Sequence, residues 1–238
     1  MADELDYLIL GAHPDDAELF CGGSIVKWLR RGCRVGVADL TRGEAGSSGT
    51  PEIRAREAAV ASQALGLTWR RNLGLPDSHL ADDQAGRKAV VTVIRETRAK
   101  VVIAPLAPCR HPDHSAVHYL ARSGCFFAGN NKFDAPHAPW RPLRLLFHPE
   151  LQPVTPSFVV DVSAEFEAKL AALRCYASQF FTPETGPKPT LIGAAEFIER
   201  VTARAAYYGS LINCRYGEAF VIEGGVRVDD PLRNLREG

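Results

Sequence analysis

Two short polar segments carry the residue types that could do chemistry. Residues 12–18 read Ala-His-Pro-Asp-Asp-Ala-Glu, and residues 110–114 read Arg-His-Pro-Asp-His. Each segment follows an apolar run, 7–11 or 101–104, of the kind found in a buried β-strand. In an open α/β sheet, ligands bind outside the carboxyl ends of the strands, so both segments are expected at one edge. Together they offer three imidazoles and three aspartates, enough for a His/His/Asp metal site with one carboxylate left over as a base.

The elements that must position these segments alternate between strand and helix. Strands are expected at 5–10, 34–40, 69–73 and 101–104, and helices at 19–31, 51–65, 87–98 and 114–127. This order predicts a mostly parallel sheet flanked by helices, with right-handed crossovers. The last third predicts strands at 143–147 and 158–162, helices at 164–178 and 194–211, and a hairpin over 219–228 that turns at Gly224-Gly225. We therefore expect a single α/β domain over residues 1–238, with C-terminal helices and a hairpin.

Composition excludes several classes of protein. The 238 residues are 46% hydrophobic, which is ample for the core of one large domain. Lys plus Arg equals Asp plus Glu, at 28 each, so no net charge favours nucleic acid or an anionic membrane as a partner. No apolar run reaches transmembrane length, and the acidic start lacks the features of a signal peptide, so we expect a cytoplasmic protein.

The six cysteines contain no Cys-x-x-Cys pair, which excludes a zinc ribbon and a thioredoxin motif. In a cytoplasmic chain they are expected to be reduced and to behave as small hydrophobic residues. Cys109 differs from the others because it lies two residues before His111.

His13 and Asp16 are three residues apart at a strand-to-helix turn, so both side chains can reach one point in the crevice. The alternative is that Asp15 or Asp16 simply caps the following helix. Capping needs one short polar side chain, however, and not a histidine with two carboxylates. We therefore expect His13 and Asp16 to be metal ligands.

The second segment repeats this spacing with His111 and His114. Asp113 could cap the next helix and leave both histidines on the surface. In another variant, His114 and His118 share a helix face at i, i+4 and bind the metal together. Three further histidines stand alone, and we expect each to be exposed to water or hydrogen-bonded within the protein rather than to bind a metal: His79, His137 and His148.

Hydrolysis at such a metal needs separate groups for separate tasks. The metal would keep an open position for water, and a free carboxylate beside it would take the proton. Asp15 suits the base because it is adjacent to a ligand but points elsewhere. His111 suits the oxyanion and the leaving group, with Asp113 orienting its ring. This chemistry does not distinguish amide, ester and phosphate substrates.

Arginines form a third group in or near the loops of the same edge. Arg54, Arg110 and Arg141 are candidates for holding a carboxylate of the substrate, whereas Arg56 is expected to be ordinary surface charge. Arg110 is next to the histidine segment, so its guanidinium must be close to the site.

These residues resemble the LmbE-like (PIG-L) family of metal-dependent N-deacetylases over nearly the whole chain. Within the family, the likeness is to the bacillithiol biosynthesis deacetylases, which act on N-acetylglucosaminyl malate. The two histidine segments are specific to the family. Five further segments carry the likeness to the subgroup: 39–41, 49–54, 72–77, 176–180 and 216–220.

The resemblance implies a Rossmann-like fold, a mononuclear zinc site and a homohexamer built as a trimer of dimers. The implied zinc ligands are His13, Asp16 and His114, with Asp15 as the general base. The implied oxyanion stabiliser or general acid is His111, backed by Asp113. Arg54, Arg110 and Arg141 match family positions near the acidic end of the substrate. The chain departs from the family pattern at 77–79 and 148–149, which are expected in the walls of the cleft.

Three functions therefore remain open. The first is release of acetate from an N-acetylglucosamine conjugate, with N-acetylglucosaminyl malate as the expected substrate. The second is deacetylation of another glycoside, such as a chitooligosaccharide or an aminoglycoside-like compound. The third is a nucleotide-binding module, although residues 12–18 lack the G-x-G-x-x-G pattern that this needs. The sequence does not distinguish zinc from ferrous iron, since both accept His/His/Asp sets.

Overall fold

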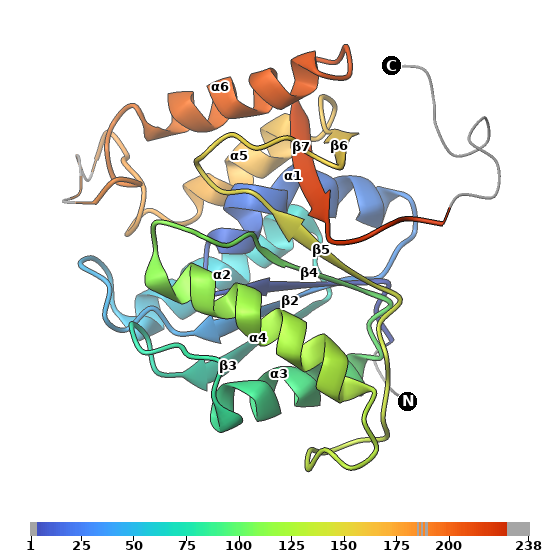
Figure 1. The fold of residues 1–238 in the computed structure, drawn as a ribbon. Helices are drawn as coiled ribbons and strands as arrows, with labels where there is room; N and C mark the ends of the chain where they lie inside the picture. Colours follow the sequence, from blue (N-terminus) through green and yellow to red (C-terminus); the bar gives the residue numbers. More distant parts are fainter. Residues whose placement is uncertain (1–3, 185, 187, 189, 228–238) are drawn as a thin grey trace.

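Seven strands of the described residues form one sheet, in the order β3-β2-β1-β4-β5-β7-β6 (Figure 1). The structure is a computed structural model and describes residues 4–184, 186, 188 and 190–227. The strands are β1 (Tyr7–Gly11), β2 (Val35–Thr41), β3 (Trp69–Leu75), β4 (Val101–Pro105), β5 (Arg144–His148), β6 (Phe158–Asp161) and β7 (Gly217–Ile222). The helices are α1 (Asp16–Arg30), α2 (Pro51–Leu65), α3 (Gln84–Thr97), α4 (Pro112–Ala128), α5 (Phe166–Arg174) and α6 (Phe197–Ser210).

The strands from β3 to β5 run parallel, which confirms the predicted α/β class. β1 lies at the centre of these five strands, where Tyr7 pairs with Val35 of β2 on one side and Val101 of β4 on the other. The strand order changes direction between β1 and β4, and such a switch point opens a crevice at the carboxyl ends of the strands.

The C-terminal strand differs from the prediction. β7 pairs antiparallel with β5 and β6, and residues 223–227 form no return strand. The predicted hairpin at Gly224-Gly225 is therefore wrong for these residues, and Val228 lies outside the described part of the chain. Apolar residues on both sides of the glycines imitate a two-stranded pattern, but β7 finds its hydrogen-bond partners in strands that are distant in sequence.

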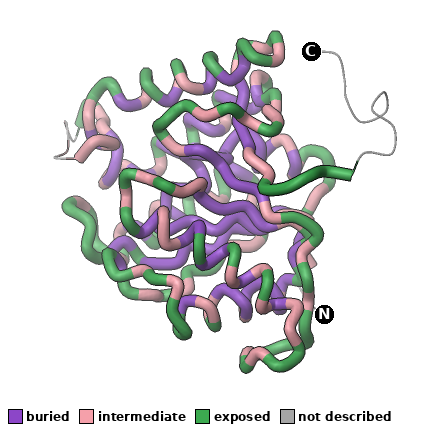
Figure 2. Tube along the Cα trace, viewed as in Figure 1, coloured by how far each residue is buried: buried purple, intermediate pink, exposed green. Residues whose placement is uncertain are grey.

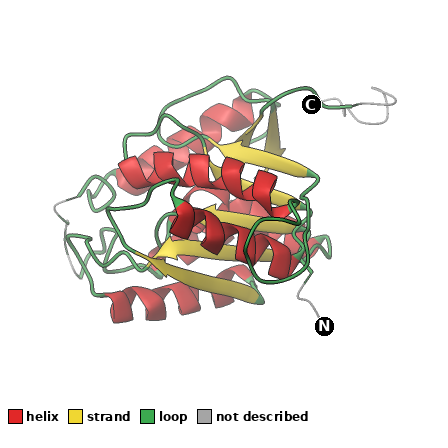
Figure 3. Ribbon diagram, turned by 60° about the horizontal axis from the view of Figure 1, so that its bottom comes forward, coloured by secondary structure: helices red, strands yellow, loops and turns green. Residues whose placement is uncertain are grey.

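Helices cover both faces of the sheet (Figure 3), and an apolar layer joins the sheet to them on each face. α1, α2, α5 and α6 contribute to the layer on one face, and α3 and α4 contribute to the layer on the other. The central strands are buried between these layers, as Figure 2 shows, and this explains their nearly continuous apolar sequences. Among the described residues, no helix is both long and apolar enough to cross a membrane.

Local interactions set the ends of the helices. α2 covers the predicted residues because Thr50 caps its first turn and Gly66 ends it in the left-handed conformation, with φ 80°. α5 is shorter than predicted and ends at Arg174. The chain turns away after it, and Ser178 donates hydrogen bonds from its backbone amide and its hydroxyl to Glu57, at 2.7 and 2.6 Å.

A buried ion pair ties α5 to β7 and α1. Lys169 Nζ donates to Glu218 Oε1 at 2.6 Å, and both side chains are almost inaccessible to water. The Glu218 carboxylate also accepts from the backbone amides of Gly23 and Ser24, at 3.0 and 2.7 Å. Removing one partner of such a pair is costly because the remaining charge stays buried.

Lys169→Met should lower the free energy of unfolding by about 3–5 kcal/mol, because Glu218 would remain buried without its counter-charge. Lys88 offers a matched control, since its ammonium pairs with the exposed Asp134 at 2.9 Å. Lys88→Met should change stability by less than about 1 kcal/mol. Urea unfolding followed by circular dichroism measures the free energy of unfolding of both variants. Equal losses of stability would show that the buried pair contributes no more than the exposed pair.

Candidate metal and catalytic site

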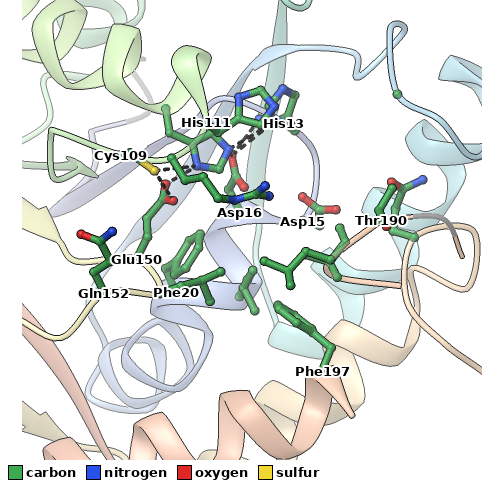
Figure 4. A pocket seen from close by; sticks show the side chains of 18 of the residues that line it. His13, Asp15, Asp16, Phe20, Cys109, His111, Glu150, Gln152, Thr190 and Phe197 are labelled. Carbon is green, nitrogen blue, oxygen red and sulfur yellow. Dashed lines mark hydrogen bonds and ion pairs between the residues drawn. The ribbon is translucent and has the colours of Figure 1, made fainter. Parts of the chain in front are cut away.

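The carboxyl ends of the parallel strands open onto a pocket of about 460 Å³, which both polar segments line (Figure 4). The turn after β1 and the start of α1 supply His13, Asp15 and Asp16. The loop after β4 and the first turn of α4 supply His111 and His114. The two segments therefore meet at the edge that the sequence predicts.

Three potential ligand atoms in this pocket face one another. His13 Nδ1 lies 3.2 Å from His114 Nε2, and Asp16 Oδ2 lies 3.7 Å from the first nitrogen and 3.4 Å from the second. A tetrahedral divalent metal with bonds of about 2.0–2.2 Å would hold such atoms about 3.3–3.6 Å apart. The donor types and their spacing therefore fit a metal ion, and these three residues form a group that could hold one.

Two carboxylates orient the imidazoles from outside this triangle. Asp77 Oδ1 lies 3.0 Å from His13 Nε2, and Glu150 Oε1 accepts a hydrogen bond from His114 Nδ1. Such partners fix the tautomer and direct the other ring nitrogen toward a metal. The sequence analysis did not predict these two roles. Both residues come directly after strands of the same sheet, and this position was the available signal.

The charges around the triangle favour a cation. Burial lowers the pKa of His13, but the carboxylates of Asp113 and Asp77 outweigh this effect and raise it to about 9. Burial also lowers the pKa of His114, but the Asp16 carboxylate and the hydrogen bonds to Cys109 and Glu150 outweigh this effect and raise it to about 11. The metal-free site therefore holds protons that a metal must displace, so metal affinity should fall as the pH falls.

Asp15 has a strained backbone, with φ 122° and ψ −25°. Its carbonyl oxygen accepts from Leu19 N at 2.9 Å, so α1 begins at Asp16, three residues earlier than predicted. The Asp15 side chain makes no capping hydrogen bond, so the capping alternative is wrong for this residue. Strained residues of this kind cluster at functional sites.

The Asp15 carboxylate faces Arg54 instead, whose Nη2 lies 3.3 Å from Oδ2. Burial raises the pKa of Asp15 to about 7, against the opposing effect of Arg54. Gly43 makes room for this contact, because a Cβ there would lie 1.9 Å from Arg54 Nη1. A carboxylate with a pKa near neutrality is suited to exchange protons in this pocket.

His111 caps α4, since its Nδ1 accepts from the backbone amide of Asp113 at 3.3 Å. This contact leaves Nε2 as the nitrogen that carries the proton. Burial lowers the pKa of His111, and the neighbouring His114 and His13 lower it further. The ring is therefore a neutral hydrogen-bond donor near pH 7.

The position of Asp113 corrects one prediction. Its carboxylate accepts from the backbone amides of Ser78 and Leu80, at 2.7 and 3.3 Å, and lies 3.6 Å from His13 Nε2. It makes no hydrogen bond to the ring of His111. The backbone amide of Asp113 orients the ring of His111, and the carboxylate of Asp113 faces His13 instead.

The three candidate arginines lie in different places. Arg54 is buried, and its Nη2 donates to Pro14 O at 2.7 Å as well as contacting Asp15. Arg110 is exposed, lines the pocket and forms no ion pair with the described residues. Arg56, predicted as ordinary surface charge, is exposed and does not line the pocket.

The placement of Arg141 at the active edge is wrong for this chain. Arg141 packs against Gly129, just after α4, and its guanidinium lies 5.6 Å from the ring centroid of Phe126. α4 has 17 residues and spans about 25 Å, so its last turn is far from the pocket at its first turn. The loop that carries Arg141 leads into β5, which places it at the amino edge of the sheet.

The remaining histidines do not complete the triangle. His118 Nδ1 bonds to Pro105 O at 3.1 Å, and the residue does not line the pocket, so the variant with His118 as a ligand is wrong. His79 contacts the backbone of its own loop. His148 is buried against Phe20, at 4.9 Å between ring centroids, and has no hydrogen-bond partner among the described residues. Burial lowers the pKa of His148 to about 3.

The wall opposite the polar groups is largely apolar. Phe20 of α1 and Phe197 of α6 project into the pocket in Figure 4, and Leu151, Leu191 and Ile192 extend the same wall. These residues come from segments that are distant in sequence, and no local pattern distinguishes them from core residues. The pocket therefore joins a charged half to an apolar half.

Residues 8–125 match the family model for PIG-L, described as GlcNAc-PI de-N-acetylase. This stretch contains both polar segments and all three ligand atoms of the triangle. The chain belongs to the PIG-L family.

Three relatives extend the likeness beyond this stretch. The diacetylchitobiose deacetylase of Thermococcus kodakarensis is 28% identical over 92% of this chain and 83% of its own length. The probable N-acetyl-alpha-D-glucosaminyl L-malate deacetylase 2 of Bacillus anthracis is 27% identical over 78% of this chain and 86% of its own length. Among solved structures, a conserved protein from Thermus thermophilus is 41% identical, covers 94% of this chain and 97% of that chain, and has a TM-score of 0.85.

His114→Ala should reduce the bound metal to a small fraction of one equivalent, because a site with three protein ligands cannot spare one. His118→Ala is the matched control on the next turn of α4 and should keep its metal. Elemental analysis of both purified variants after loading with zinc gives the answer. A variant at 118 that loses the metal while the variant at 114 keeps it would reverse the ligand assignment.

Proposed function

We propose that this chain is a zinc-dependent deacetylase that hydrolyses the N-acetyl group of an N-acetylglucosamine conjugate and releases acetate. The observation that carries the proposal is the triangle of His13, Asp16 and His114 with Asp15 beside it, in a chain of the PIG-L family. Relatives named as deacetylases of diacetylchitobiose and of N-acetylglucosaminyl malate support the class of substrate.

The metal would be held by His13, Asp16 and His114, and when bound it would polarise the amide carbonyl and lower the pKa of a water molecule. Zinc is proposed because three such ligands with one open position are typical of catalytic zinc, although ferrous iron accepts the same donors. Asp77 and Glu150 keep both imidazoles oriented for this task.

Asp15 would take a proton from the attacking water and return it to the leaving amine. Its pKa of about 7 suits both directions of transfer. Arg54 and the strained turn hold the carboxylate in place. His111 would donate a hydrogen bond from Nε2 to the oxyanion that forms when water adds to the carbonyl carbon.

The particular substrate that we propose is N-acetylglucosaminyl malate, which would place the enzyme in bacillithiol biosynthesis. Arg110 supports this proposal, because it lines the pocket with no ion pair to the described residues and is free to meet a carboxylate. Arg54 already contacts Asp15, and Arg141 lies elsewhere, so recognition of malate depends on Arg110. A neutral chitooligosaccharide is the second candidate, favoured by the apolar half of the pocket.

Asp15→Asn should keep one equivalent of metal and lose about two to four orders of magnitude in kcat, because it removes the base without removing a ligand. Acetate release and metal content measured on the same protein test this together. Asp16→Asn is the contrasting variant and should lose metal first. A metal-loaded Asp15→Asn protein with normal turnover would remove Asp15 from the mechanism.

Arg110→Ala should lower kcat/KM for the malate conjugate by about thirty- to a thousand-fold, the effect of losing an ion pair worth about 2–4 kcal/mol. The neutral methyl glycoside should lose much less. The quantity to measure is the ratio of the two kcat/KM values, because Arg110 is next to His111 and its loss can slow both substrates equally. Arg56→Ala is the control for surface charge. An unchanged ratio would favour a neutral oligosaccharide over the malate conjugate.

A further inference from the structure

A second cluster of metal-binding atoms lies beside the triangle. Cys109 in the loop after β4, His114 in the first turn of α4 and Glu150 after β5 each offer one ligand atom, and these atoms all lie within 4.8 Å of one another. In the view of Figure 4, Cys109 and Glu150 sit together on the side of Asp16 opposite Asp15. Cys109 takes no part in the proposed hydrolysis, and the outward nitrogen of His114 takes part only through the hydrogen bond to Glu150 that orients the ring.

The donor set differs in kind from the first one. It combines a sulfur, an imidazole nitrogen and a carboxylate, whereas the triangle has two nitrogens and an oxygen. Cys109 Sγ lies 3.9 Å from His114 Nδ1, a spacing that a zinc ion with bonds of about 2.3 Å to sulfur and 2.0 Å to nitrogen can bridge. A thiolate favours soft cations, and the partial exposure of Cys109 and Glu150 to the pocket gives an ion a way in.

We propose that Cys109, His114 and Glu150 form a second, inhibitory metal site that takes a thiophilic divalent cation such as Zn²⁺ or Cd²⁺ once the first site is filled. The proposal rests on the proposed metal role of His13, Asp16 and His114.

The same three side chains have two arrangements. In the structure, Glu150 accepts hydrogen bonds from Cys109 Sγ through Oε2 and from His114 Nδ1 through Oε1. A cation bound there replaces both hydrogen bonds, and the thiol proton and the Nδ1 proton leave to solvent. His114 would then serve one cation at each ring nitrogen and lose the carboxylate contact that orients it. The second cation therefore binds more weakly than the first and disturbs the first site.

Titration of the metal-free, full-length protein with Co²⁺ tests the proposal without turnover. The first equivalent should give visible ligand-field bands with no sulfur contribution. The second should add a near-ultraviolet thiolate-to-cobalt band. Cys109→Ser should abolish that band and keep the binding of the first equivalent. Cys175→Ser is the matched control, because Cys175 is also partly exposed but lies outside the pocket, and it should keep both signals.

Glu150→Gln provides a second variant that does not alter the thiol. It should weaken binding of the second equivalent by at least about tenfold, since it replaces a charged ligand with a neutral one. A wild-type protein that binds one equivalent but shows no thiolate band at higher Co²⁺ would overturn this inference alone. A band that survives in Cys109→Ser would do the same. A protein that fails to bind even the first equivalent would instead overturn the proposed function.

Discussion

The parallel pairing of β1 with β4 is the constraint on which the site depends. It brings residues 13 and 114 together across a hundred residues of chain and sets their ring nitrogens 3.2 Å apart. The helices that follow these two strands pack on opposite faces of the sheet, since α1 belongs to one apolar layer and α4 to the other. The chain therefore turns to opposite faces of the sheet after β1 and after β4, while the side chains at these two turns meet. The crevice between the turns is a result of this topology.

Within this crevice, each carboxylate takes its role from its partner. Asp16 faces two imidazoles and is suited to a cation, whereas Asp15 faces one arginine and has a pKa near neutrality. Asp77 and Glu150 accept from the outer nitrogens of the same imidazoles. His13 and His114, whose pKa values are raised, and Arg54 offset part of this buried negative charge, and a cation at the triangle would offset more of it.

Much of this arrangement is predictable from sequence because the signals are local. The two histidine segments, the strands before them and the bounds of α2 follow from short-range patterns of apolar, polar and turn residues. The apolar wall around Phe197 was missed, since its place in the site depends on packing between distant segments. Glu150 was missed although its position just after β5 was a usable signal. Arg141 was misplaced for a related reason: it precedes a strand and so lies at the amino edge. A guanidinium can hold a carboxylate, but Arg141 comes before β5 and therefore lies at the edge of the sheet opposite the pocket.

The backbone conformation of Asp15 lowers the stability of the fold but places a carboxylate in the pocket. A φ of 122° is one that glycine adopts freely and aspartate does not, so the folded chain gives up about 1–3 kcal/mol to keep a carboxylate there. Selection for stability alone would place glycine at this position and leave the three proposed metal ligands unchanged. With glycine the turn would be free of strain and the three proposed ligands would remain, but no carboxylate would be present to accept a proton. A variant with glycine at this position would thus keep the fold and the three proposed ligands but lose the proposed base.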